Sequence, residues 1–178
     1  MILYKLTDAN GQTRDGTQWG EGVSNTATGE GAALCTSGVI HGYRTALIAV
    51  FMGPAHTDYL PGGYLWESVG EIIADDGLKV GCKTLTTLRR VELPRITLAQ
   101  TVVAGILCAK TVPQPPQWRT WADDWLSGAD RSEKAASAAS AAASAAAWEA
   151  ASAATWARTA STVKPFDLPG VLEQAMKY

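Results

Sequence analysis

Three side chains in the N-terminal half combine an imidazole, a phenol and a carboxylate. His41 and Tyr43 stand two residues apart in one short apolar run, and Glu67 lies in a second such run. These groups can act on one substrate only if the fold brings them within hydrogen-bond reach of it. The reading that we favour is structural, with His41 as a satisfied core or turn histidine and Glu67 as a solvated strand residue.

In residue type and chain order, the trio resembles the His–Tyr–Glu set of some ADP-ribosyltransferase-like folds. The resemblance implies that His41 would hold the ribose of NAD, that Tyr43 would stack on the nicotinamide and that Glu67 would polarise a ribose hydroxyl. This is an analogy at the level of the fold. An NAD-using enzyme is therefore the alternative function, while our leading expectation is a protein without cofactor or catalytic activity.

Other catalytic and metal-binding motifs are missing from the sequence. It contains no dinucleotide-binding glycine pattern, P-loop, nucleophile elbow or zinc-protease motif. Cys35, Cys82 and Cys108 are odd in number and widely spaced, which suggests neither a zinc site nor a disulfide framework. A reducing, cytoplasmic setting is therefore expected. Asp123 and Asp124 are neighbours on an expected helix, so their carboxylates point in different directions and share no acid–base site.

Basic residues gather in the second half of the β-rich region. A solvated strand face explains them, and a surface for an acidic partner is the alternative, with Arg89 and Arg90 as candidate contacts. His56, in the loop between Gly53 and Tyr59, is expected to be polar surface. The net charge of −2 argues against a general nucleic-acid binder, so we do not expect direct contact with nucleic acid. The basic residues are Lys79, Lys83, Arg89, Arg90 and Arg95.

Residues 1–94 must position these groups, and their pattern predicts a small, curved antiparallel sheet. Short apolar runs separated by glycine predict strands at 2–6, 38–43, 64–69, 71–74, 78–80 and 84–93, with a turn at 75–77. A short helix is expected from Arg44 to Met52, stopped by Gly53-Pro54. The stretch rich in Gly, Thr and Ser from Gly16 to Gly38 is long for a loop, and such loops are often functional.

Residues 95–178 change to a helical period, which makes the fold class α+β with an all-helical C-terminal region. Helices are expected near 98–110, 116–127, 130–163 and 169–177. Thr97 and Gln100 form a capping-box pattern before the first helix. Asp130 with Glu133 predicts the start of the long helix, and Pro165 predicts its end. The second helix places Trp118, Trp121 and Trp125 on one face.

The third of these helices is almost entirely alanine and serine, which strongly favours a helix. Small side chains let two helix backbones approach closely. The helix could therefore pack internally against the three tryptophans, or its face could pair with a second copy or another protein. Alanine and serine are too weakly hydrophobic for a membrane span. The residues of the candidate contact stripe are Ser140, Ser144, Trp148, Ser152 and Trp156.

Several blocks of the sequence resemble a family of small, uncharacterised proteins encoded by phages, prophages and related mobile elements. The blocks are Tyr4–Thr13 with Gln18-Trp19-Gly20, the Ile40-His41-x-Tyr43 element, Leu65-Trp66-Glu67, Asp76–Cys82, and Trp125–Ser132 before the alanine-rich tail. The resemblance covers nearly the whole chain and implies action in the cytoplasm of a bacterium. It brings no activity and therefore no functional residues.

These observations favour a non-enzymatic protein of a phage or mobile element that binds a bacterial protein or ribonucleoprotein complex. Inhibition of a defence system, an anti-CRISPR-like role, is its most concrete form. Two alternatives stay open. One is the NAD-using enzyme with an ADP-ribosyltransferase-like domain, and the other is a structural or virion protein that self-associates, as a homodimer for example, through the Ala/Ser face.

Overall fold

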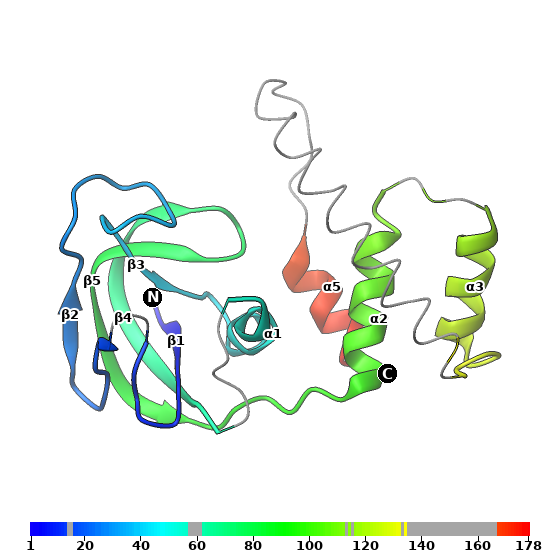
Figure 1. Cartoon of the computed structure of the whole chain (residues 1–178), viewed down its shortest axis with the longest axis horizontal. Coiled ribbons are helices and arrows are strands. Elements are labelled where there is room, and N and C mark those ends of the chain that lie inside the picture. The colour runs from blue at the N-terminus through cyan, green and yellow to red at the C-terminus, as the bar shows by residue number, and fades with distance from the viewer. Residues whose placement is uncertain (14–15, 57–61, 113, 115, 133, 135–166) are drawn as a thin grey trace. The chain divides into compact units, whose positions relative to one another are not determined.

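A computed structural model describes residues 1–13, 16–56, 62–112, 114, 116–132, 134 and 167–178 (Figure 1). The chain divides into two compact units, Met1–Arg95 and Ile96–Tyr178. The first unit contains the sheet and the second contains helices α2, α3 and α5. Within the described residues, the structure is therefore an α+β mixture with an antiparallel sheet, as the sequence predicts.

The sheet of the first unit has five antiparallel strands, with β5 at its centre. The order is β1 (Leu3–Thr7), β4 (Tyr64–Asp75), β5 (Val80–Val91) and β2 (Ser24–Thr26), and β3 (Ile40–Gly42) also pairs with β5. β2 and β3 lie along the same edge of β5, where β2 pairs with Thr84–Thr86 and β3 pairs with Val80–Cys82. Figure 1 shows β4 and β5 as one long, strongly curved hairpin.

The curvature brings the two ends of the sheet together. Tyr4 of β1 and Tyr43, directly after β3, each donate a backbone N–H to the other's carbonyl, at 2.8 and 2.9 Å. Irregularities in the β4–β5 register after Glu67, Gly70 and Ile72 supply the bend. A side chain at position 70 would stand 2.6 Å from the carbonyl oxygen of Thr84, so this close approach requires glycine.

A compact apolar core fills the inside of the curved sheet. Its buried members come from β1, β5 and the segment before β2, and Ile40 and Ile72 pack against them. Trp19 is positioned by its indole N–H, which donates to the Thr13 hydroxyl at 2.9 Å. Burial of this apolar cluster stabilises the first unit. The core residues are Leu3, Trp19, Val80, Cys82 and Leu85.

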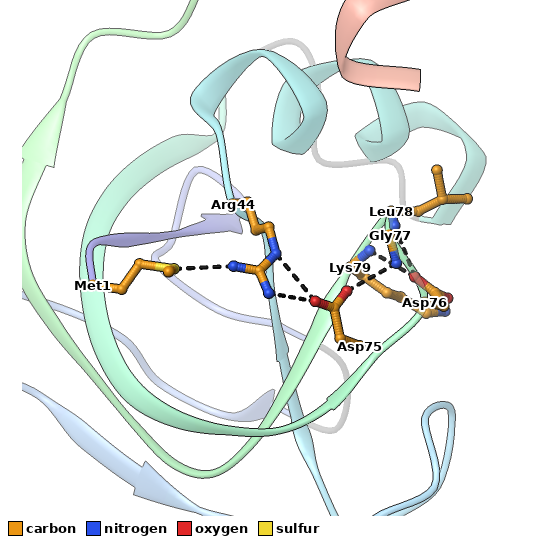
Figure 2. Close-up of polar contacts among 7 residues, drawn as sticks. All are labelled: Met1, Arg44, Asp75, Asp76, Gly77, Leu78 and Lys79. Atoms are coloured by element: carbon orange, nitrogen blue, oxygen red, sulfur yellow. Dashed lines mark hydrogen bonds and ion pairs between the residues drawn. The ribbon is translucent and has the colours of Figure 1, made fainter. Parts of the chain in front are cut away.

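The β4–β5 hairpin corrects two strand predictions. Residues 64–69 and 71–74 belong to one twelve-residue strand, because Gly70 is accommodated in the ladder and does not end it. The turn at 75–77 is confirmed: the Asp75 carboxylate accepts the N–H of Gly77, and the Asp76 carboxylate accepts those of Leu78 and Lys79 (Figure 2). Leu78 and Lys79 therefore belong to the turn, and β5 begins at Val80.

The long stretch from 16 to 38 is more ordered than the sequence predicts. It contains β2, whose Ser24 and Thr26 hydroxyls bond to the Thr86 and Thr84 hydroxyls on β5. The loop that follows closes on itself through a 2.8 Å bond from Gly29 N to Ser37 O. A side chain at position 38 would meet backbone carbonyl oxygens at 2.4 and 2.5 Å, so tight backbone packing selects glycine there.

Helix α1 (Ala46–His56) is longer than expected and packs against β1. Ile48 and Ala49 are 2% and 0% exposed, which places them in the packed side of the helix. The prediction that Gly53-Pro54 ends the helix is wrong, because the helix continues to His56. A proline near a helix end removes only one intrahelical hydrogen bond. His56 is therefore the last helical residue and does not belong to a loop.

The helices of the second unit begin and end as local signals predict. In α2 (Leu98–Ala109), Thr97 and Gln100 make both bonds of the capping box. α3 (Pro116–Ser127) ends before Gly128, whose φ is +85°. α5 (Leu168–Ala175) is capped by Asp167, which accepts the N–H of Gly170. α2 packs against α5, and the tryptophan face of α3 packs with Val102 and Ile106 of α2.

The predicted alanine-rich helix is not confirmed. Asp130, Arg131 and Ser132 are not helical, because the Asp130 carboxylate accepts the N–H of Ser132 in a turn. The start of a helix at Asp130 is therefore wrong. The remainder of the prediction, with its Glu133 and Pro165 boundaries, lies outside the described residues apart from Lys134. The same holds for the proposed contact residues Ser140, Ser144, Trp148, Ser152 and Trp156.

Candidate functional site

Arg90 is held over an aromatic ring at the open end of the β4–β5 hairpin. Its guanidinium carbon lies 3.7 Å from the centre of the Tyr64 ring. Arg90 pairs with Trp66, which stands two residues after Tyr64 and so on the same face of β4. Trp66 contacts Tyr64 edge-on at 6.1 Å, and its indole N–H donates to Thr7. The Tyr64 ring, over which Arg90 lies, is therefore held in place by the buried side chain of Trp66.

Arg90 also lines an open depression of about 600 Å³. The walls are residues 90–95 together with Gly63 and Leu65. Arg90, Glu92 and Arg95 are exposed. Among the described residues, the side chains of Arg90 and Arg95 have no hydrogen bond and no ion pair. Two arginines whose side chains have no acceptor among the described residues thus line one depression.

Arg89, the neighbour of Arg90, has a different role. It donates to both carboxylate oxygens of Glu67, at 2.7 and 2.8 Å. β5 places Arg89 directly opposite Glu67 on β4, which explains the bidentate contact. The Glu67 side chain is only 19% exposed. Of the two arginines proposed as partner contacts, Arg89 therefore forms an ion pair within the sheet. The N–H groups of Arg90 remain available to a ligand.

His41, Tyr43 and Glu67 take part in separate structural contacts. The Nε2 atom of His41 accepts the backbone N–H of Cys35 at 2.9 Å. Tyr43 is buried at the point where the sheet ends meet. Strand register places Tyr43 and Glu67 on either side of Tyr4, roughly 10 Å apart at two strand spacings. Glu67 gives both oxygens to Arg89, and none of the three lines the depression.

A half-buried lysine is the group that sequence reasoning missed. Lys5 on β1 donates to the carbonyl oxygen of His41 at 2.8 Å, and its ammonium lies 5.1 Å from the centre of the Trp19 ring. Burial of the ammonium lowers the pKa of Lys5 to about 8, against a small opposing effect of Cys82. The alternation in β1 could have revealed it, because Lys5 shares a strand face with the core residue Leu3.

The folded loop before β3 presents an exposed thiol. Lys79 donates to the Cys35 sulfur at 2.9 Å, and Lys83 donates to the Gly29 carbonyl at 2.6 Å. Cys35 has a φ of +63°, the one positive value among the described residues other than glycine. Two of the five basic residues therefore anchor this loop. By contrast, burial raises the pKa of the Cys82 and Cys108 thiols.

The β4–β5 turn contains an ion pair that fixes the segment between β3 and α1. Arg44 donates through two nitrogens to one carboxylate oxygen of Asp75 and through a third to the Met1 sulfur (Figure 2). The hydrogen bond from Arg44 lowers the pKa of Asp75, with help from the N–H of Gly77. This cluster is exposed and its donors and acceptors are matched, so its role is structural.

The second unit has a smaller depression of about 260 Å³ beside Trp118. Lys110 and Asp123, which line it, form an ion pair. Asp124 does not line this depression. The indole N–H groups of Trp118, Trp121 and Trp125 are buried and have no hydrogen-bond partner among the residues that the structure describes.

The part of the chain that the structure describes contains no cluster of His, Cys, Asp or Glu able to hold a metal ion. No described helix has both the length and the apolar character needed to cross a membrane. Comparison of the chain with family models, with curated proteins and with solved structures finds no match. The candidate site therefore depends on its own geometry, and the depression lined by Arg90 and Arg95 is the one that we consider further.

Proposed function

We propose that the protein is a non-enzymatic accessory protein of a phage or other mobile element, and that it binds a bacterial protein or ribonucleoprotein complex. Inhibition of a host defence system, in the manner of an anti-CRISPR protein, is the most concrete form of this function. The proposal takes its biological setting from the sequence resemblance and its binding surface from the first unit.

One contrast carries the proposal. In the first unit, side chains with catalytic potential make structural contacts. Both carboxylate oxygens of Glu67 accept hydrogen bonds from Arg89, and His41 accepts a backbone N–H. The guanidinium groups of Arg90 and Arg95 have no acceptor among the described residues, and both line the open depression. Exposed arginines of this kind are enriched at sites where proteins bind one another.

Affinity purification from host lysate tests the proposal. The full chain and an Arg90→Gln/Arg95→Gln variant would be compared, with Lys79→Gln/Lys83→Gln as a control that removes the same charge from the loop anchors. We expect the full chain to retain a partner in near-stoichiometric amount, and the arginine variant to lose about tenfold or more of it. The control should retain the partner, and equal melting temperatures would show that all three proteins are folded.

Two results would contradict the proposal. One is the recovery of no stoichiometric partner from cells grown under several induction states. The other is a partner that is lost equally from the lysine control and the arginine variant, because that pattern would reflect net charge and not the depression.

A further inference from the structure

We infer that the depression lined by Arg90 and Arg95 is a site for carboxylate groups on an extended segment of a protein partner. The inference deepens the proposed function and rests on it for the identity of the surface. It adds the chemical class of the ligand, which is a carboxylate accompanied by backbone N–H groups.

The stacking of Arg90 decides what it can recognise. Contact between the Tyr64 ring and the guanidinium at 3.7 Å uses the flat face of the group. The N–H donors point outward along its edge, so they stay available in a fixed fork. A fork of this kind matches the two oxygens of a carboxylate or of a phosphate. Because Tyr64 is itself in contact with Trp66, little side-chain freedom is lost when an anion binds.

The size of the depression indicates more than a single ion. A volume of about 600 Å³ falls in the range of sites for small molecules and short segments. Arg95 follows Pro94, whose ring fixes its own φ and restricts the residue before it. The two cations thus stand at opposite ends of one run, 90–95, which lines the depression throughout. This arrangement suits a segment that carries at least two acceptors.

Glu92 distinguishes a protein segment from a nucleic-acid backbone. It lies between the two arginines in the sequence, is exposed and lines the same depression. A sugar–phosphate backbone presents negative charge without N–H donors, so Glu92 would repel it. A peptide alternates carbonyl and N–H groups, and its N–H groups can donate to Glu92. The whole chain also carries a net charge of −2, which further disfavours a polyanion.

Three probes separate these ligands by side-chain NMR of the full chain. The first is a capped hexapeptide of alternating glutamate and glycine, the second is a six-nucleotide oligothymidylate and the third is inorganic phosphate. At physiological salt we expect the peptide to shift the Nε–Hε signals of Arg90 and Arg95 and to bind more tightly than the oligonucleotide, although it carries fewer charges. Phosphate alone should bind more weakly than the peptide.

Variants tie the binding to the site. Arg90→Gln and Arg95→Gln should each weaken the peptide by about tenfold, as expected for loss of a charge-assisted hydrogen bond. Tyr64→Leu should weaken it while leaving both arginines in place, because Arg90 loses its platform. The Lys79→Gln/Lys83→Gln protein should bind like the wild type, and its backbone spectrum confirms the fold.

Each contrary outcome has a distinct meaning. Tighter binding of the oligonucleotide would overturn the carboxylate assignment in favour of phosphate. Absence of any shift at Arg90 and Arg95 with all three probes would overturn the site itself. If the peptide fails but the lysate partner is still lost from the arginine double variant, the proposed function stands and the ligand class is wrong. If the peptide binds but no partner is recovered from the lysate, the ligand class stands and the proposed function is wrong.

Discussion

Lys5 is a half-buried cation of the first unit, and it has no carboxylate partner among the described residues. Its ammonium donates to the His41 carbonyl and lies over the Trp19 ring, and these contacts replace only part of its hydration. The ordinary pKa of 10.5 falls to about 8 for this reason. A folded pKa below the unfolded value means that the charged form opposes folding, so Lys5 destabilises the unit at neutral pH.

The unfolding free energy should therefore depend on pH in one window. Below about pH 8, Lys5 is charged in both the folded and the unfolded chain, and the full free-energy cost of burying its charge is present. Between about 8 and 10.5 the unfolded chain binds the extra proton, so stability from this group rises with pH. Lys5→Met should raise the unfolding free energy at pH 7 by about 1–3 kcal/mol and remove this rise. Urea unfolding at pH 7, 9 and 10.5 measures both effects.

Lys83→Met is the matched control, because Lys83 is an exposed lysine of the same unit. Other groups also titrate at high pH, so the informative quantity is the difference between each variant and the wild type. A Lys5→Met protein that is less stable than the wild type at pH 7 would show that the His41 contact outweighs the cost of burial.

Helix α3 carries on one face three tryptophans whose buried N–H groups oppose folding. Trp118, Trp121 and Trp125 lie in contact along the helix, with ring centres 6.1 and 6.4 Å apart. Their indole N–H groups are buried, and the described part of the chain offers them no acceptor. Burial of a polar group without a hydrogen bond opposes folding, so the packing of these rings carries most of their stabilising effect. In the first unit, by contrast, the indole N–H groups of Trp19 and Trp66 both have acceptors.

Replacement of tryptophan by phenylalanine should separate packing from hydrogen bonding. Trp125 and Trp66 are closely matched in burial, at 5% and 8% exposed. Trp66→Phe loses the bond to Thr7, whereas Trp125→Phe loses an N–H that has no partner. We expect Trp66→Phe to reduce the unfolding free energy of its unit by about 1–2 kcal/mol more than Trp125→Phe. Denaturant melts followed by far-UV circular dichroism give both values, and equal losses would contradict the argument.

The elements differ in how far the sequence predicts them. Helices α2, α3 and α5 were predictable because their signals are local, such as the Thr97–Gln100 box and the Asp167 cap. β2 and the unbroken β4 were missed because they depend on partners far along the chain. The depression was missed for the same reason. Arg90 meets Tyr64 only because the β4–β5 register shifts after Glu67, and no pattern in either strand encodes that shift.

At the scale of the whole molecule, the chain has two units with separate cores. The sheet encloses the cluster around Leu3 and Leu85, and the helices form a second cluster around Ile106 and Trp125. The division after Arg95 follows the end of the sheet. The sequence predicted the change from a strand period to a helical period near this point. The relation of both units to the alanine-rich stretch stays a prediction.

Because its core is complete, the first unit should fold alone. A fragment of residues 1–95 contains every strand and α1. We expect it to unfold cooperatively, with near-UV circular dichroism from the enclosed Trp19 and Trp66. Lys5→Met should stabilise the fragment as much as it stabilises the full chain. A fragment with strand content but no near-UV signal would show that the first unit requires the rest of the chain.

The central position of β5 also sets the order of events on the ribosome. β2 and β3 pair with β5, and β1 pairs with β4, so each strand of the first sixty residues finds its ladder partner in residues 64–91. During synthesis these early strands emerge before their ladder partners, although the Tyr4–Tyr43 bridge and the packing of α1 on β1 join residues that are already made. Pairing across such separations is slow and leaves strand edges exposed. The unit should therefore fold late and in one step, once the β4–β5 hairpin has left the exit tunnel.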